Sequence, residues 1–189
     1  MYRRFGKRIL DILLSCLALA ILSPVLLVVA LAIRLEDGGP ALFRQQRVGR
    51  WGKPFVLFKF RSMPVNTVNV PSAQAASAVK ITRVGAFIRR TNIDELPQLI
   101  NILRGDMSIV GPRPALATQE ELCALREKLG VYRCAPGLTG LAQVNSYDGM
   151  PDTEKATWDA EYCRNVTFWT DIVIILRTFV YLLKPPPTY

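Results

Sequence analysis

The chain has 189 residues and a mass of 21.2 kDa, which suits one domain or one domain with a small appendage. Half of its residues are apolar and its mean hydropathy is +0.21, so part of the chain is expected to contact lipid. A net charge of +9, from 24 Lys and Arg against 15 Asp and Glu, favours anionic partners such as phosphates, nucleic acid or acidic lipid headgroups.

The absence of His and the spacing of the Cys residues exclude several kinds of site. With no His, Ser-His-Asp catalysis, His-ligated zinc and an imidazole base are all excluded. The four Cys have no C-x-x-C spacing, so a zinc ribbon is not supported. We interpret them as reduced packing residues in a protein that faces a cytosolic compartment.

The first predicted element is an apolar segment near the N-terminus. Residues 12–33 carry no charge, and a helix of this length would extend about 33 Å, enough to cross a hydrocarbon core of about 30 Å. No small-residue cleavage site follows, which favours an anchor over a cleaved signal peptide. Ser23 and Pro24 interrupt the run, and basic residues flank both of its ends. These features leave open a helix that spans the bilayer and a re-entrant helix that breaks at Ser23-Pro24.

A β-hairpin is predicted next. Residues 41–49 and 54–63 have strand-like composition around a turn at 49–53. Two-residue alternation places Lys59 and Arg61 on one face of the second strand, either as a solvated face or as a paired phosphate clamp.

The remaining sequence predicts a loop and then a series of short elements. Residues 66–79 are small, polar and uncharged, which is typical of a loop. After it we expect a basic amphipathic element, a helix capped by Gly105, a short strand running into a rigid turn, and two polar helices (84–90, 96–103, 107–110 with 111–114, 115–129 and 152–164). Residues 172–183 are too few to span a membrane and predict either an interfacial helix or a buried core helix.

Asp94 and Glu95 are the strongest candidates for catalytic chemistry. The two carboxylates stand at the predicted start of a helix, shortly after Arg89 and Arg90. One interpretation is helix capping, with Asn92 and Glu95 in the spacing of a capping box. The other is an anion site for a diphosphate, in which the adjacent carboxylates hold Mg²⁺ and supply a nucleophile.

Two further segments have a structural and a functional interpretation. Arg113 lies between two prolines, whose rigidity suits either phosphate binding or a buried structural ion pair. The Gly-Leu-Thr-Gly segment 137–140 is equally a structural turn or backbone that approaches a ligand.

Six motifs in this order resemble the bacterial sugar transferases, the monotopic phosphoglycosyl transferases. They are Lys-Arg-Ile-Leu-Asp (7–11), Leu-Ser-Pro (22–24), Phe-Lys-Phe-Arg-Ser-Met (58–63), Thr-Asn-Ile-Asp-Glu-Leu-Pro-Gln (91–98), Gly-Asp-Met-Ser-Ile-Val-Gly-Pro-Arg-Pro (105–114) and Pro-Gly-Leu-Thr-Gly-Leu-Ala-Gln-Val-Asn (136–145). The resemblance covers nearly the whole chain, and the length resembles the small members that hold only the catalytic core.

The resemblance implies transfer of a sugar 1-phosphate from a UDP-sugar to polyprenyl phosphate. UMP would be released, and assembly of a glycoconjugate such as an O-antigen, capsule, exopolysaccharide or glycoprotein glycan would begin. In the two-step mechanism of the family, Asp94 forms a covalent phosphosugar intermediate, Mg²⁺ assists the departure of UMP, and Glu95 completes the dyad by metal binding or positioning. Lys59, Arg89 and Arg113 match basic residues around the site of the family.

The expected architecture is α/β and mostly helical. Residues 1–36 would form a re-entrant membrane hairpin, because Ser23-Pro24 matches the helix break of the family. Residues 37–189 would form a catalytic domain with a small β-hairpin and an interfacial C-terminal helix, on the cytoplasmic face of the bacterial inner membrane. Membrane lipids are expected partners, nucleic acid is not, and a homodimer is left open.

Two rival functions come from other classes. One is a non-catalytic membrane-tethered scaffold that binds anionic lipid through its basic surface. The other is a single-pass glycosyltransferase that moves the sugar without its phosphate and therefore releases UDP.

Overall fold

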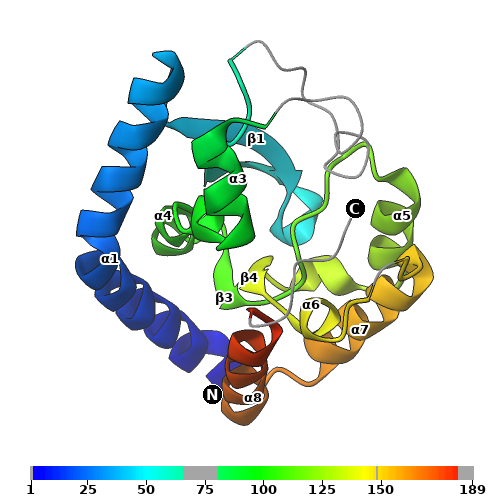
Figure 1. Cartoon of the computed structure of the whole chain (residues 1–189). Coiled ribbons are helices and arrows are strands. Elements are labelled where there is room, and N and C mark those ends of the chain that lie inside the picture. Colours follow the sequence, from blue (N-terminus) through cyan, green and yellow to red (C-terminus); the bar gives the residue numbers. More distant parts are fainter. Residues whose placement is uncertain (1, 66–80, 148, 183–189) are drawn as a thin grey trace.

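A long helix dominates the N-terminal part of the computed structural model, which describes residues 2–65, 81–147 and 149–182. A wide turn over Tyr2–Gly6 leads into α1, Lys7–Asp37, which bends near its middle and follows one side of the molecule (Figure 1). The predicted break is therefore wrong in detail, because one unbroken helix runs through Pro24. Pro24 leaves the carbonyl of Ala20 without its usual N–H donor, and the Ser23 hydroxyl donates to that carbonyl at 3.0 Å.

Both ends of α1 are attached to the rest of the protein. Near its beginning, Lys7 Nζ pairs with Asp171 at 2.6 Å. Near its end, a carboxylate oxygen of Glu36 accepts a hydrogen bond from the backbone N–H of Arg83 at 2.7 Å. A straight helix of 31 residues would extend about 46 Å. Because α1 bends, its two ends contact the same folded body.

The predicted β-hairpin is confirmed. Strand β1, Leu42–Val48, pairs antiparallel with β2, Pro54–Phe60, through a turn at Arg50–Gly52. The second strand is shorter than predicted because it ends at Phe60. Arg61 consequently lies beyond the ladder and does not continue the face that carries Lys59.

The helices that follow agree with the sequence pattern, with changes at their ends. Helix α3 spans Arg83–Arg90, α4 spans Gln98–Arg104, and Gly105 ends α4 in the left-handed conformation with φ of 91°. Helix α7, Asp152–Arg164, has the predicted bounds, whereas α5 covers only Glu120–Lys128 of the predicted 115–129.

A second small sheet brings distant parts of the chain together. The expected strand β3, Ser108–Val110, pairs parallel with β4, Gly137–Thr139, which the sequence did not predict, and the short helix α6, Leu141–Val144, follows it. A Cβ atom at Gly137 would lie 2.1 Å from the backbone nitrogen of Gly111. The glycines of this segment therefore allow backbone to pack on backbone, which supports the structural interpretation.

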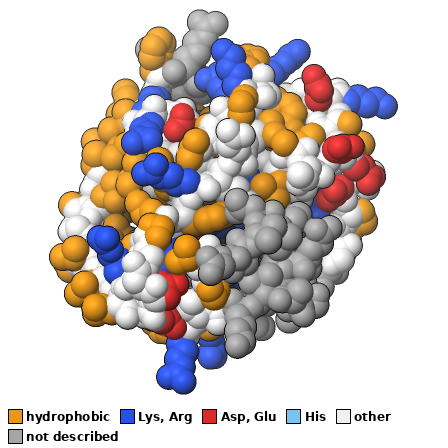
Figure 2. Space-filling view, turned by 90° about the horizontal axis from the view of Figure 1, so that it is seen from above, with side chains coloured by type: hydrophobic (Ala, Val, Ile, Leu, Met, Phe, Trp, Pro, Cys, Tyr) orange, Lys and Arg blue, Asp and Glu red, His pale blue; other side chains and the backbone are white. Residues whose placement is uncertain are grey.

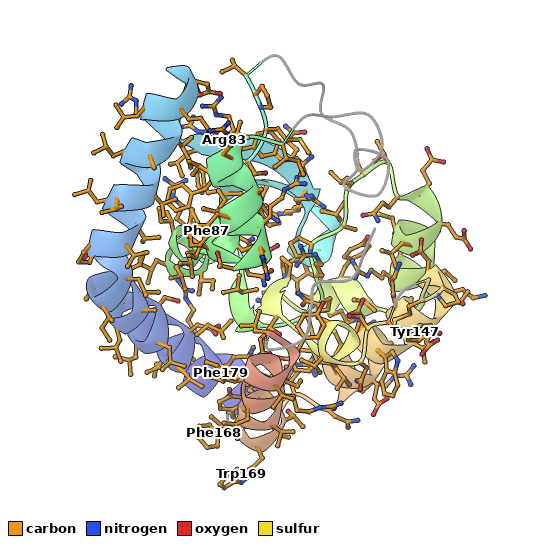
Figure 3. The ribbon with its side chains drawn as sticks, in the orientation of Figure 1. Arg83, Phe87, Tyr147, Phe168, Trp169 and Phe179 are labelled. Atoms are coloured by element: carbon orange, nitrogen blue, oxygen red, sulfur yellow. The ribbon has the colours of Figure 1, made fainter. Side chains whose placement is uncertain are left out.

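Helix α8, Phe168–Leu182, begins earlier than predicted and is only partly buried, so the predicted interfacial position stays a prediction. Asp171 and Ile174 are buried against the body of the protein. Apolar side chains on its other faces are exposed, and Phe168, Trp169 and Phe179 project from it in Figure 3. The predicted loop 66–79 and the proline-rich C-terminal residues lie outside the described residues.

The core that supports the site lies where α4 packs on the hairpin. Leu57, Ile102 and Met107 are almost fully buried there. Asn101 is also fully buried, and its side chain accepts from the N–H of Phe58 at 3.0 Å. Its amide nitrogen donates to the carbonyl of Val56 at 2.7 Å, so Asn101 satisfies the free edge of β2. All four Cys are free thiols.

Candidate active site

Asp94 and Glu95 lie on a tight turn between α3 and α4. The turn is the 3₁₀ segment Ile93–Glu95, and it follows Asn92, whose φ of 55° places it in the left-handed region. Asn tolerates this conformation better than most residues, which gives a local reason for the turn. The capping interpretation is wrong, because the Asn92 side chain makes no capping hydrogen bond and α4 begins only after Pro97.

Glu95 is held between two cations. Its Oε1 atom lies 2.7 Å from Lys59 Nζ and 2.6 Å from Arg113 Nη2. Arg113 Nη1 approaches the other carboxylate oxygen at 3.4 Å. Burial by itself would raise the pKa of Glu95, but the Arg113 and Lys59 charges outweigh it and hold the pKa well below its ordinary value. Glu95 is therefore ionised and fixed in place.

Asp94 is in a different state although it is the adjacent residue. It is buried, and no described side chain donates a hydrogen bond to its carboxylate. Burial raises the pKa of Asp94; the Lys59 charge opposes this effect, and the Glu95 charge adds to it. The turn thus presents one carboxylate that is neutralised by its partners and one that is available for chemistry.

Three of the four predicted basic residues surround this pair. Lys59 and Arg113 contact Glu95 directly, and Arg89 acts electrostatically on Asp94 while its Nε donates to Ser62 Oγ at 2.8 Å. The Arg113 side chain remains 48% exposed. The ion pair is therefore not the buried one that the sequence allowed, and phosphate binding by Arg113 stays a prediction.

Arg61, the fourth predicted basic residue, has other partners. Its guanidinium pairs with both carboxylate oxygens of Asp37, and its Nε donates to the carbonyl of Pro40 at 2.8 Å. These contacts attach the end of α1 to the hairpin. The geometry therefore favours a structural role for Arg61 over phosphate binding.

Arg47 is a site residue that the sequence analysis did not select. Its guanidinium donates to Gln45 Oε1 at 3.1 and 2.6 Å and to the carbonyl of Pro114 at 3.2 Å. Burial, with a smaller contribution from the nearby Arg113 charge, lowers the pKa of Arg47 to about 10. Alternation along β1 could have identified it, because every second residue from Phe43 onward faces inward.

A buried ion pair between α5 and α7 supports the backbone of the turn that carries Arg113. Arg126 on α5 contacts Asp159 on α7 at 2.6 Å, and both side chains are almost fully buried. Arg126 Nη1 also donates to the backbone carbonyl of Arg113 at 2.8 Å. This arrangement fixes the backbone of the segment whose guanidinium reaches Glu95, and nothing in the local sequence predicted it.

The donor set agrees with Mg²⁺ at Asp94 better than at Glu95. Both oxygens of Glu95 accept from cations, whereas the Asp94 carboxylate is uncommitted. Mg²⁺ is commonly bound by one or two carboxylates together with substrate phosphates and water. Within the described part of the chain, no cluster of three or more acidic or Cys residues could hold a metal by itself.

A buried carboxylate without a hydrogen-bond donor, beside several cations, is typical of enzymes that act on phosphorylated substrates. The sequence profile of the bacterial sugar transferases matches residues 2–185. The chain belongs to the bacterial sugar transferase family and is an enzyme of that class.

Three relatives illustrate the match. A Caulobacter vibrioides protein described as UDP-glucose:undecaprenyl-phosphate glucose-1-phosphate transferase is 43% identical over 97% of this chain and 72% of its own length. An Escherichia coli K12 protein of the same description is 45% identical over 93% of this chain and 39% of its own length. The undecaprenyl-phosphate galactose phosphotransferase of Salmonella typhimurium is 40% identical over 98% of this chain and 42% of its own length. The chain therefore spans about two-fifths of the last two relatives.

Proposed function

We propose that this protein transfers a sugar 1-phosphate from a UDP-sugar to undecaprenyl phosphate. The observation that carries the proposal is the asymmetry of the dyad: Glu95 is bound by two cations while Asp94 is available beside it. Among the described residues, four cations interact with Asp94 or Glu95, namely Lys59, Arg47, Arg89 and Arg113, so the site holds a surplus of positive charge. Four positive charges against two negative charges suit a diphosphate.

The chemistry follows in two displacements at one phosphorus atom. An Asp94 carboxylate oxygen attacks the β-phosphorus of the UDP-sugar, the bond to the bridging oxygen breaks, and its electron pair leaves with UMP. The resulting mixed anhydride joins Asp94 to the sugar 1-phosphate. A phosphate oxygen of undecaprenyl phosphate then attacks the same phosphorus and releases the Asp94 carboxylate. Mg²⁺, when bound, would offset the charge of the diphosphate during the first displacement.

Lys59, Arg89 and Arg113 would stabilise the charge that develops on the phosphoryl oxygens. Glu95 would keep two of these cations in position without attacking phosphorus itself, since both of its oxygens accept hydrogen bonds. Preorganised charges of this kind lower the barrier because they need no reorientation during the reaction. Asp94 lies on the same turn as Glu95, but no described side chain donates a hydrogen bond to its carboxylate.

We further propose that α1 is re-entrant and places the site at the cytoplasmic face of the membrane. By length and composition α1 could cross a bilayer, and only 11% of its most apolar window is buried. Its two ends, however, bind the same body through Lys7 with Asp171 and Glu36 with the backbone of Arg83. A helix that crossed the membrane would carry one of these ends to the opposite side.

Exposed apolar surface supports this placement beside the lipid. Figure 2 shows apolar side chains gathered along the side of the molecule that α1 occupies, with basic side chains next to them. On α8, Trp169 and Phe179 are exposed and project outward in Figure 3. Exposed aromatic residues and basic residues are both typical of the headgroup region, where a lipid phosphate would reach the site.

The experiment that tests the function is a product assay on purified protein with a panel of UDP-sugars and undecaprenyl phosphate. We expect release of UMP and, without the lipid, an adduct of one phosphosugar on the peptide that contains Asp94. Release of UDP would indicate a glycosyltransferase, and no turnover with any sugar would indicate a scaffold. The panel should include glucose, galactose and N-acetylgalactosamine, for which relatives are named.

A further inference from the structure

Arg47 carries a half-buried positive charge to which the two displacements above assign no role. Its three donated hydrogen bonds go to the side-chain oxygen of Gln45 and the carbonyl of Pro114, which are neutral acceptors. Within the described residues it forms no ion pair with a carboxylate. A guanidinium has five N–H donors, so two remain for another partner. A partly desolvated cation that lacks a directly bound carboxylate is costly, and an anionic ligand bound beside it would offset this cost.

The hairpin register places Arg47 on the same face as Lys59. Lys59 is opposite Phe43, and four pairs further along the ladder Arg47 is opposite Phe55. Directly opposed residues of an antiparallel pair share a face, so both long side chains extend from the inner face of the hairpin. Their Cα atoms are separated along the strands by about 13 Å. Two cations thus lie on one face of the hairpin, and Lys59 contacts the turn of Asp94 through Glu95.

Arg113 lies between the reactive carboxylate and Arg47. The guanidinium of Arg113 binds Glu95, while Arg47 binds the carbonyl of the next residue, Pro114. The charges that act on Asp94 are those of Lys59, Glu95, Arg89 and Arg113, whereas Arg47 interacts with Arg113 and Glu95. Arg47 is therefore linked to the Asp94 turn through the segment that carries Arg113.

We propose that Arg47 binds the α-phosphate of the UDP-sugar and, after the first displacement, the phosphate of the departing UMP. The inference rests on the proposed function. Displacement at phosphorus is roughly in line, so the leaving group points away from the attacking Asp94 oxygen. The assignment places the leaving group on the side of the Arg113 segment, whose Pro114 carbonyl Arg47 binds. The two remaining N–H donors would then contact the phosphate that leaves with the nucleoside.

This assignment makes Arg47 specific for one half of the reaction. UMP has left before the lipid phosphate attacks, so Arg47 has no ligand in the second displacement. Its loss should weaken donor binding and slow formation of the adduct. The rate at which undecaprenyl phosphate discharges a preformed adduct should stay within about twofold of the native value.

The direct test compares UMP with uridine as probes, measured by calorimetry on the full chain in detergent or nanodiscs. Arg47→Met removes the guanidinium and keeps the length of the side chain. We expect UMP to bind about 10- to 100-fold more weakly, the usual effect of losing a hydrogen bond to a charged group, while uridine binding is unchanged. Arg44→Met is the matched control, since Arg44 is exposed on the outer face of the same strand. The control should bind UMP as the native protein does.

The remaining outcomes also decide the question. Equal weakening of UMP and uridine, or equal slowing of adduct formation and discharge, would show a structural role through Pro114 and overturn the proposal. Should Arg47→Met unfold, Arg47→Lys provides the measurement: it keeps the charge but loses the planar donors, so UMP should weaken about 3- to 10-fold. Unchanged UMP affinity in Arg47→Lys would then overturn the proposal. Failure of the native protein to form the adduct would instead refute the proposed mechanism, and the UMP and uridine comparison would still test Arg47.

Discussion

Lys59 Nζ lies 2.7 Å from Glu95 Oε1, and both side chains are more than four-fifths buried. This ion pair joins the β-hairpin to the turn that carries Asp94. It also separates the roles of two adjacent acidic residues, because the cations that fix Glu95 leave Asp94 uncommitted.

Glu95→Gln should destabilise the fold at neutral pH. The amide cannot balance Lys59 and Arg113, so two cations would remain without their shared partner, at a cost of about 1–3 kcal/mol. Thermal unfolding in detergent at pH 7 would measure the change. Glu121→Gln is the control, since Glu121 is exposed on α5 and its loss should have little effect. A native unfolding temperature for Glu95→Gln would contradict the structure.

The same residue predicts how stability depends on pH. The pKa of Glu95 is lower in the folded protein than in the unfolded chain, where it is about 4.3. As pH falls, Glu95 is therefore protonated in the unfolded chain before it is protonated in the folded protein. The contribution of Glu95 is therefore complete above about pH 5 and is lost as pH falls toward the folded pKa. Unfolding curves between pH 7 and 3 should converge for the native protein and Glu95→Gln. Parallel curves would exclude this linkage.

Asp94→Asn should abolish turnover without weakening the fold. The amide cannot form the covalent intermediate, so we expect adduct formation to fall by at least about 1,000-fold. Because burial raises the pKa of Asp94, its ionised form disfavours folding at neutral pH, and removing the charge should leave Tm unchanged or raise it by up to about 4 °C. Mass spectrometry and thermal unfolding without metal measure the two effects. Near-native turnover would refute the nucleophile assignment.

Asn101→Leu tests the link between α4 and the hairpin. The substitution leaves the Phe58 N–H and the Val56 carbonyl without their buried partner, which should cost about 2–4 kcal/mol. Denaturant unfolding would measure the loss. Gln46→Leu changes an exposed residue of the same hairpin and should have a much smaller effect. Equal effects would show that Asn101 does not support the strand.

The position of α1 can be tested by labelling. In a background without native Cys, Arg3→Cys and Gln46→Cys lie on either side of the helix. With a re-entrant helix, an impermeant reagent should label neither residue in intact spheroplasts and both after permeabilisation. Combined Ser23→Ala and Pro24→Leu substitution should straighten the helix and expose Arg3→Cys in part of the population. External labelling of either residue in the native helix would require a spanning arrangement.

Local patterns in the sequence predicted most of the elements and the candidate catalytic residues. Apolar length indicated α1, alternation indicated the hairpin, and Gly105 marked the end of α4, because each depends on neighbours in the chain. The motif around Asp94 identified the dyad for the same reason, since its acidic residues and the arginines upstream are close together in the chain. It did not reveal that Asp94 and Glu95 differ in state.

Only the tertiary structure decided which charges meet. Arg61 and Lys59 are two residues apart, yet one pairs with Asp37 and the other with Glu95, since β2 ends between them. Arg47 reaches the site through contacts with Pro114, 67 residues away in the chain. Ion pairs and desolvation depend on distances across the fold, and a linear sequence specifies those distances only once the core has packed.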